Sequence, residues 1–117
     1  MSFTLPRGRI IRSKRDIEAL LEKGESFFKY PIKATYLLRE DDGVSRMMVS
    51  VPKRLFHDAV DRNLLKRRIR EAFRTNSGLL NRVSADIMFV YVGKETADYE
   101  RIENSVKALL AAIDSSR

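Results

Sequence analysis

Residues 53–73 read KRLFHDAVDRNLLKRRIREAF, and they combine a basic pattern with an apolar one. Pro52 ends the apolar stretch before them, Asp58 is a good helix N-cap, and no Pro or Gly follows until Gly78. These signals predict a helix of roughly 59–75. The helix separates two apolar stretches that are typical of strands, so it sets the order of the elements around it.

This predicted helix has an apolar face and a basic face. At 100° per residue, the apolar side chains gather on one side: Leu65, Ile69, Ala72 and Phe73. The other side carries a basic arc of about 140°: Arg62, Asn63, Lys66, Arg67, Arg70 and Arg74. Arg62 lies at the seam, and Arg68 lies off the arc beside Asp61, where we expect a salt-bridged flank. Since like charges one turn apart destabilise a helix, the arc favours binding of a polyanion.

Local signals predict the remaining elements. Ser13 and Asp16 resemble a capping box, and Gly24 suits a left-handed helix C-terminus. Pro31 favours an edge position or a break between strands, and the Asp-Gly step at 42–43 favours a hairpin into the next strand. The predicted helices are 14–23, 59–75 and one that starts at Thr96 or Asp98, and the predicted strands are 27–30, 32–39, 46–51 and 86–92.

The order of these elements is αβββαβα, which predicts an α/β (α+β) two-layer sandwich. A strand–helix–strand unit near the end implies a parallel pair in a mixed sheet of about four strands. The 117 residues fit one domain, 1–117. The chain has no cysteine, and its longest apolar runs are six residues, too short for a bilayer. We therefore expect a soluble cytoplasmic protein.

Charge is concentrated in two segments. The chain carries a net charge of +7, with a pI near 10.0. Residues 7–15 contain five bases and no acid, and residues 53–74 contain eight bases and three acids. The remainder is mildly acidic. This distribution favours a nucleic-acid partner over a merely solvated surface.

The stretch 53–73 resembles the RNR signature of the bacterial ribonuclease P protein. About ten residue types over twenty-one positions carry the resemblance: Lys53-Arg54, Ala59-Val60, Arg62-Asn63, Lys66-Arg67, Arg70 and Ala72-Phe73. Supporting features occur in the family's order along the rest of the chain: Phe3, the basic stretch, the helix end at Gly24 and the strand at Asp86.

The resemblance implies an RNA-binding subunit with no catalytic residues and no cofactor of its own, because magnesium held by the RNA drives hydrolysis. The implied partners are the catalytic RNA and precursor tRNA, with one monomeric protein per RNA and no membrane. The implied RNA-docking residues are Lys53, Arg54, Arg62, Asn63, Lys66, Arg67, Arg70 and Arg74. The family also implies a left-handed βαβ crossover, against the usual rule, as in the second domain of a small-subunit ribosomal protein.

In this family a cleft between the first helix and the sheet contacts the single-stranded 5′ leader of precursor tRNA. The residues expected there are Arg12, Lys14, Ile17, Leu21 and Tyr36. The family's first helix usually offers aromatic residues, whereas Ile17 and Leu21 stand at those places here, and aliphatic residues lack the ~1–3 kcal/mol per base of aromatic stacking. Ile17 and Leu21 are as compatible with filling the core as with lining the cleft. Alternative stacking residues are Phe27, Phe28, Tyr30 and Tyr36.

Two other classes of function compete with this interpretation. A protein-only nuclease needs clustered metal-binding carboxylates or paired histidines, whereas this chain has His57 alone, beside the cap residue Asp58, and scattered acids. Asp41-Asp42 fits a turn or a loosely held magnesium. A helix-turn-helix DNA binder needs a helix where 46–51 is predicted to be a strand. A ribosomal or other structural RNA-binding protein is consistent with the physics, and the RNR signature decides against it.

Overall fold

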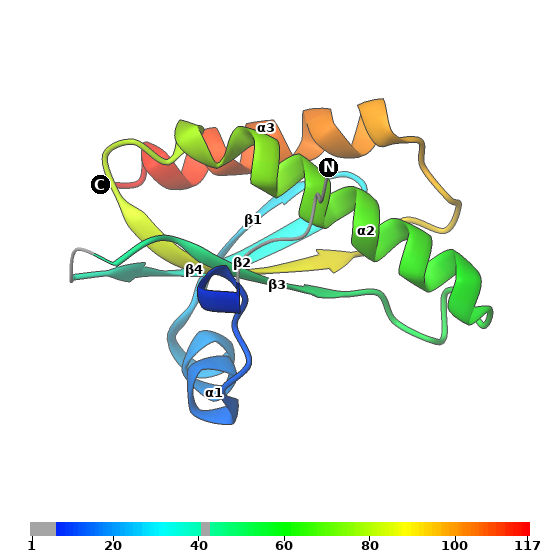
Figure 1. The fold of residues 1–117 in the computed structure, drawn as a ribbon, viewed down its shortest axis with the longest axis horizontal. Coiled ribbons are helices and arrows are strands. Elements are labelled where there is room, and N and C mark those ends of the chain that lie inside the picture. The colour runs from blue at the N-terminus through cyan, green and yellow to red at the C-terminus, as the bar shows by residue number, and fades with distance from the viewer. Residues whose placement is uncertain (1–6, 41–42) are drawn as a thin grey trace.

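The computed structural model describes residues 7–40 and 43–117, and its elements follow the predicted order (Figure 1). A short 3-10 turn, η1 (Arg7–Arg9), precedes α1, and η2 (Ser77–Leu79) follows α2. The α-helices are α1 (Lys14–Lys23), α2 (Ala59–Asn76) and α3 (Tyr99–Asp114). The strands are β1 (Glu25–Lys29), β2 (Ile32–Arg39), β3 (Arg46–Ser50) and β4 (Ser84–Tyr91). No helix among the described residues is long and apolar enough to cross a membrane.

The four strands form one mixed sheet in the order β1-β2-β4-β3. β3 and β4 are parallel and joined through α2, which confirms the predicted βαβ unit. β1 and β2 are antiparallel and are separated at Pro31, as expected. The predicted hairpin between β2 and β3 is wrong, because β4 lies between them and pairs with both. Every second side chain of β4 is buried, and a central position in the sheet buries such a strand best.

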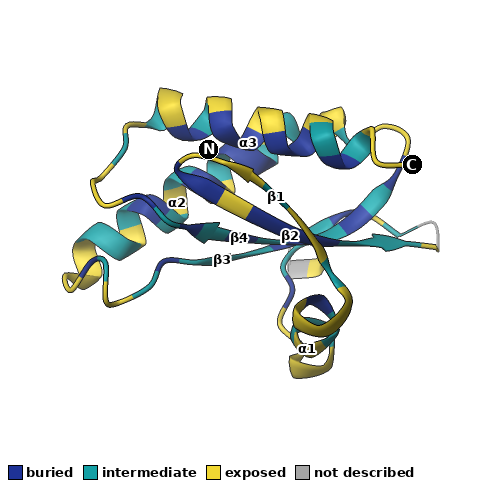
Figure 2. Cartoon of the chain, turned by 180° about the vertical axis from the view of Figure 1, so that it is seen from behind, coloured by how far each residue is buried: buried dark blue, intermediate teal, exposed yellow. Residues whose placement is uncertain are grey.

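The helices lie on both faces of the sheet. α2 and α3 cover one face, whereas α1 crosses the other (Figure 1). Between the sheet and the α2–α3 layer lies the core, which includes Met47, Ile69, Phe73, Phe89 and Leu110. Figure 2 shows buried residues along the sheet and the inner sides of α2 and α3, and mostly exposed residues on α1. The face that α1 crosses is therefore only partly covered, and we call it the open face.

The ends of α1 differ from the local prediction. Ser13 is the N-cap, but its side chain makes no capping bond, and the Asp16 carboxylate binds Arg46 instead. Gly24 is extended, with φ −69° and ψ 147°, rather than left-handed. A Cβ at Gly24 would meet the Leu20 carbonyl and would lie 2.7 Å from Thr35 Cγ2. Glycine is needed here because a Cβ would collide with the Leu20 carbonyl of α1 and with Thr35 on β2, not because the helix end requires a positive φ.

Candidate nucleic-acid interface

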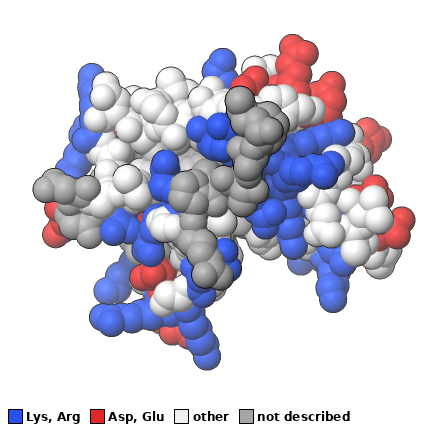
Figure 3. Space-filling view, in the orientation of Figure 1, with Lys and Arg blue, Asp and Glu red and all other residues white. Residues whose placement is uncertain are grey.

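The outer side of α2 carries the predicted basic arc. The apolar side of α2 is buried against the core, as the helical spacing predicts: Leu65, Ile69, Ala72 and Phe73. Asn63, Arg67 and Arg70 are exposed and Lys66 is half-buried, so all four remain accessible. Figure 3 shows lysine and arginine side chains gathered over α2 and again around α1. A helix whose apolar side is fixed by the core therefore presents its cations to one direction of solvent.

Arg62 braces the loop that precedes α2. Its Nη1 donates to the Phe56 carbonyl at 2.7 Å and to the His57 carbonyl at 2.8 Å. Hydrogen bonds to a charged group are worth more than neutral ones, so this guanidinium fixes the loop. The exposed Lys53 and Arg54 lie in the same connection between β3 and α2. Arg62 therefore restrains the loop that also carries these two cations, a role that its position at the edge of the basic arc did not reveal.

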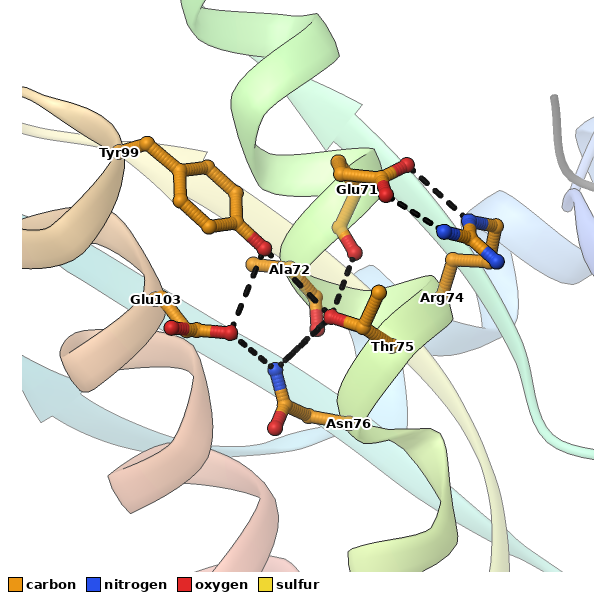
Figure 4. A network of polar contacts seen from close by, with 7 residues as sticks. All are labelled: Glu71, Ala72, Arg74, Thr75, Asn76, Tyr99 and Glu103. Atoms are coloured by element: carbon orange, nitrogen blue, oxygen red, sulfur yellow. Dashed lines mark hydrogen bonds and ion pairs between the residues drawn. The ribbon is translucent and has the colours of Figure 1, made fainter. Parts of the chain in front are cut away.

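Arg74 ends the basic arc with a compensated charge. Its Nη2 lies 2.6 Å from Glu71 Oε1 and its Nε lies 3.0 Å from Glu71 Oε2 (Figure 4). The hydrogen bonds between these side chains raise the pKa of Arg74 and lower the pKa of Glu71. The sequence prediction gave Arg74 the same role as its neighbours, whereas the structure pairs it with an acid one turn earlier.

A polar network fixes the end of α2 on α3 (Figure 4). Asn76 Nδ2 donates to the Ala72 carbonyl at 2.8 Å and to Glu103 Oε2 at 3.0 Å, which links the two helices. Tyr99 OH donates to the same oxygen of Glu103 at 3.4 Å. Burial is the main cause of the raised pKa of Tyr99. These contacts restrain rotation of α2 and so fix the direction of its basic arc.

Arg68 lies off the basic arc, as predicted, but its partner differs. Its Nη1 donates to the Ala97 carbonyl at 2.5 Å, in the loop between β4 and α3. The salt-bridged flank with Asp61 was a wrong prediction, since no such ion pair occurs among the described residues. The arginine therefore contributes to packing of the β4–α3 loop.

Arg9, from the basic N-terminal segment, lies beside α2. Its guanidinium lies 5.4 Å from the centroid of the Phe73 ring, and its Nε donates to the Ser45 carbonyl at 2.6 Å. Ile10 forms a parallel bridge with Met47, and Ile11 N donates to the Met47 carbonyl at 2.9 Å. The sequence showed a basic segment but gave no sign that the fold brings it to α2 and the edge strand β3.

The residues predicted to contact the leader divide between the two faces of the sheet. Arg12 and Lys14 are exposed at the start of α1, Ile17 is half-buried, and Leu21 is 65% exposed. Tyr36 is only 4% exposed and pairs in register with Ile87 on the face that α2 and α3 cover. The prediction that Tyr36 lines the leader cleft does not fit this position.

Tyr36 already has partners inside the fold. Its ring stacks on Phe27 with centroids 5.5 Å apart and planes 8° apart, and its OH donates to Glu25 Oε2 at 3.2 Å. Two of the four aromatic alternatives are therefore used for packing. Phe28 lies on the opposite face of β1, because successive side chains alternate across a strand.

No arrangement typical of a protein nuclease appears among the described residues. They contain no group of three or more His, Asp or Glu side chains that could hold a metal ion. His57 is exposed, and its backbone carbonyl binds Arg62. Asp41-Asp42 lies outside the described residues.

The site thus belongs to a small basic α/β protein with cations on one helix and a partly open sheet face, the class that binds polyanionic chains. A family model for ribonuclease P matches residues 5–114. The ribonuclease P protein component of Porphyromonas gingivalis strain W83 is 33% identical over 120 residues, covering 96% of this chain and 88% of that protein. The chain belongs to the ribonuclease P protein family, which confirms the resemblance.

Solved structures agree with the fold. The RNase P protein from Thermotoga maritima has a TM-score of 0.76 and 26% identity, covering 87% of this chain and 94% of that one. The Staphylococcus aureus RNase P protein has a TM-score of 0.78 at 24% identity, covering 92% of this chain and 96% of that one.

The triplet that gives the signature its name reads Arg62-Asn63-Leu64 here, so this chain lacks the second arginine of the triplet.

Proposed function

We propose that this chain binds the catalytic RNA of ribonuclease P and assists removal of the 5′ leader from precursor tRNA. The observation that carries the proposal is the basic arc of α2, which the core and the contacts to α3 hold in one direction. The arc offers three accessible cations, Lys66, Arg67 and Arg70, and the preceding loop adds Lys53 and Arg54. Arginine grips phosphate oxygens with two parallel hydrogen bonds, and Asn63 adds a directional contact to a base edge or a 2′-hydroxyl.

The leader of precursor tRNA is proposed to lie on the open face beside α1. The exposed Arg12 and Lys14 supply positive charge there, and Ile17 and Leu21 supply apolar surface. The protein acts as one cytoplasmic monomer per RNA. Its benefit is to hold the leader and to screen repulsion between two polyanions, and its side chains take no part in bond breaking. Magnesium ions held by the RNA supply the chemistry.

The first test is reconstitution with the catalytic RNA. Single-turnover cleavage of precursor tRNA is measured with the RNA alone at high magnesium and salt, and with the holoenzyme at physiological ionic conditions. We expect RNA-alone activity at high salt, because ions replace the screening, and a lower apparent KM with protein at low salt. His57→Ala should leave the chemical step near wild type. Cleavage by the purified protein alone would contradict the proposal.

The second test measures how salt weakens binding between the protein and the catalytic RNA. Five accessible cations release counterions from about five phosphates, so a log–log plot of affinity against salt should have a slope of roughly −3.5 to −4.5. A slope near zero would show that the basic arc is not the docking surface.

A further inference from the structure

The strand β1 forms one edge of the sheet. In the order β1-β2-β4-β3, the described residues give β1 one strand neighbour, which is β2. The outer side of β1 therefore presents backbone N–H and C=O groups that no strand pairs with, and such an edge is a template for pairing with another chain. Four of its five residues are exposed, and Figure 2 shows it along the border of the sheet. This edge is thus accessible to a partner.

The centre of this edge is apolar. Residues 25–29 read Glu-Ser-Phe-Phe-Lys. Phe28 is 62% exposed and points to the open face, whereas Phe27 is half-buried on the other face, where it stacks on Tyr36. An accessible edge that combines aromatic side chains with backbone groups available for pairing favours association between chains.

The two charged residues of β1 favour one way of pairing with a second copy of the chain. When β1 lies antiparallel to its copy with Phe27 on the two-fold axis, all five residues are paired. Glu25 then lies opposite Lys29 of the second copy, and Lys29 lies opposite its Glu25. Both side chains point to the face that α3 covers, because positions 25, 27 and 29 share one side of the strand. Opposite charges that face each other across antiparallel strands stabilise the pair.

Other arrangements of the two strands lose this match of charges. A parallel arrangement in register would place Glu25 opposite Glu25 and Lys29 opposite Lys29, and like charges in that position are destabilising. An antiparallel pair centred on a different residue leaves part of each strand unpaired. A lysine on an edge strand ordinarily discourages pairing. Here the acid at the other end of the same strand compensates it, so the charges select a single register.

The helix beside β1 leaves room for a second copy. Ser105 on α3 donates a hydrogen bond to the Lys29 carbonyl at 2.6 Å, so this side of α3 lies over β1. At 100° per residue, Ala108 continues the same side of the helix, and it is exposed with a short side chain. Arg101, one turn earlier, is folded over the Tyr30 ring, 5.2 Å from its centroid. Short or folded side chains therefore border the edge, and they permit close approach of another sheet.

We propose that two copies of the free chain associate through β1, as an antiparallel pair centred on Phe27 that joins the two sheets into one. The inference goes beyond the proposed function and does not depend on it. Because α3 lies over β1 and β2 while α2 lies against β3, the basic arc is at the other end of the sheet and stays accessible in both copies. The ratio of one chain per RNA is therefore unchanged. A strand of five residues buries little area, so the dimer is reversible rather than permanent.

The experiment measures the mass of the purified full chain by sedimentation equilibrium, from micromolar to millimolar concentration at physiological ionic strength. Wild type should pass from monomer to dimer within this range. Lys29→Glu places a second carboxylate opposite Glu25 at both ends of the pair and should raise the dissociation constant about tenfold or more. The double variant Glu25→Lys/Lys29→Glu restores opposite charges and should recover association. Lys107→Glu is the control, because it makes the same change in net charge at an exposed position on α3 away from β1; it should match wild type.

Wild type that stays monomeric up to millimolar concentration would overturn the proposal. A dimer that is equally tight in Lys29→Glu and Lys107→Glu, or that the double variant does not restore, would place the contact elsewhere and overturn it as well. Amide hydrogen exchange gives a second readout, since protection should rise with concentration in residues 25–29 and not in β3 at the other edge. Thermal unfolding accompanies each variant, because Glu25→Lys also removes an acceptor of the Tyr36 hydroxyl.

Discussion

Arg46 and Asp86 pair across the parallel strands β3 and β4, with Arg46 Nη2 2.6 Å from Asp86 Oδ2. The same arginine lies 3.2 Å from Asp16 on α1, and the same aspartate lies 3.1 Å from Arg39 on β2. The hydrogen bonding that Arg46 donates to the Asp86 carboxylate is the largest cause of the raised pKa of Arg46. Four elements meet in this neutral network, so it ties α1 to the sheet and holds the open face in shape.

Replacing Asp86 with Asn should destabilise the fold. The change leaves Arg39 and Arg46 close together without their shared carboxylate, and hydrogen bonds to charged groups are worth about 1.5–3 kcal/mol. Urea unfolding measures the loss. Glu18→Gln is the control, because it breaks an exposed 3.9 Å pair with Lys14 that should be worth less than about 1 kcal/mol. Equal losses in the two variants would contradict the proposed role of the network.

Arg62→Ala should lower both stability and affinity for the catalytic RNA. It removes two hydrogen bonds to the carbonyls of Phe56 and His57, at a cost of about 1.5–3 kcal/mol. It also frees the loop that carries the flanking cations. Arg70→Ala, at an exposed position on the same helix, should lower RNA affinity and change stability by less than about 0.5 kcal/mol. An Arg62 variant with wild-type stability would refute the bracing role.

Arg67→Ala and Arg68→Ala should separate binding from packing. Arg67 is exposed in the basic arc, so its loss should weaken RNA docking by about 1.5–3 kcal/mol if the contact is desolvated. Arg68 instead donates to the Ala97 carbonyl, so its loss should act on stability and much less on docking. Filter binding and thermal unfolding of both variants give the comparison. The assignment of the helix face is wrong if the two variants lose RNA affinity equally.

Asp114 should make folding sensitive to acid. Its Oδ1 accepts hydrogen bonds from the backbone N–H groups of Arg82 at 2.6 Å and Asn81 at 2.8 Å, and the bond from Arg82 is the main cause of its lowered pKa. A carboxyl with a lowered folded-state pKa contributes its stability above the unfolded-state value near 3.8 and loses it as pH falls through the folded-state value.

The stability gap between wild type and Asp114→Asn should therefore be full at neutral pH and should shrink as pH falls below about 4. Urea unfolding at pH 7, 5 and 3 measures it, with the exposed Glu22→Gln as a control for general charge effects. A gap that widens toward low pH would have the wrong sign for this explanation.

Periodicity and breaker residues were sufficient to predict the elements and the orientation of α2. Leu65, Ile69 and Phe73 recur at helical spacing, and because burial of apolar area dominates packing, they fixed which side of the helix faces outward. Strand pairing was harder to predict. The Asp-Gly step indicated a turn, but turn chemistry does not decide which strand a segment pairs with, and β4 took the place beside β2. The apolar run at 87–92 was the available signal for a central strand.

The sequence by itself determined that the chain is basic, that its cations repeat along one side of a helix and that its family is recognisable, because these properties depend on residue type and spacing. Only the tertiary structure decided which of these residues are available. Arg62 and Arg68 bind carbonyls, Arg74 binds an acid, and Tyr36 is buried while Phe28 is exposed. These outcomes depend on contacts between residues far apart in the chain, and a one-residue difference in a strand places a side chain on the opposite face of the sheet.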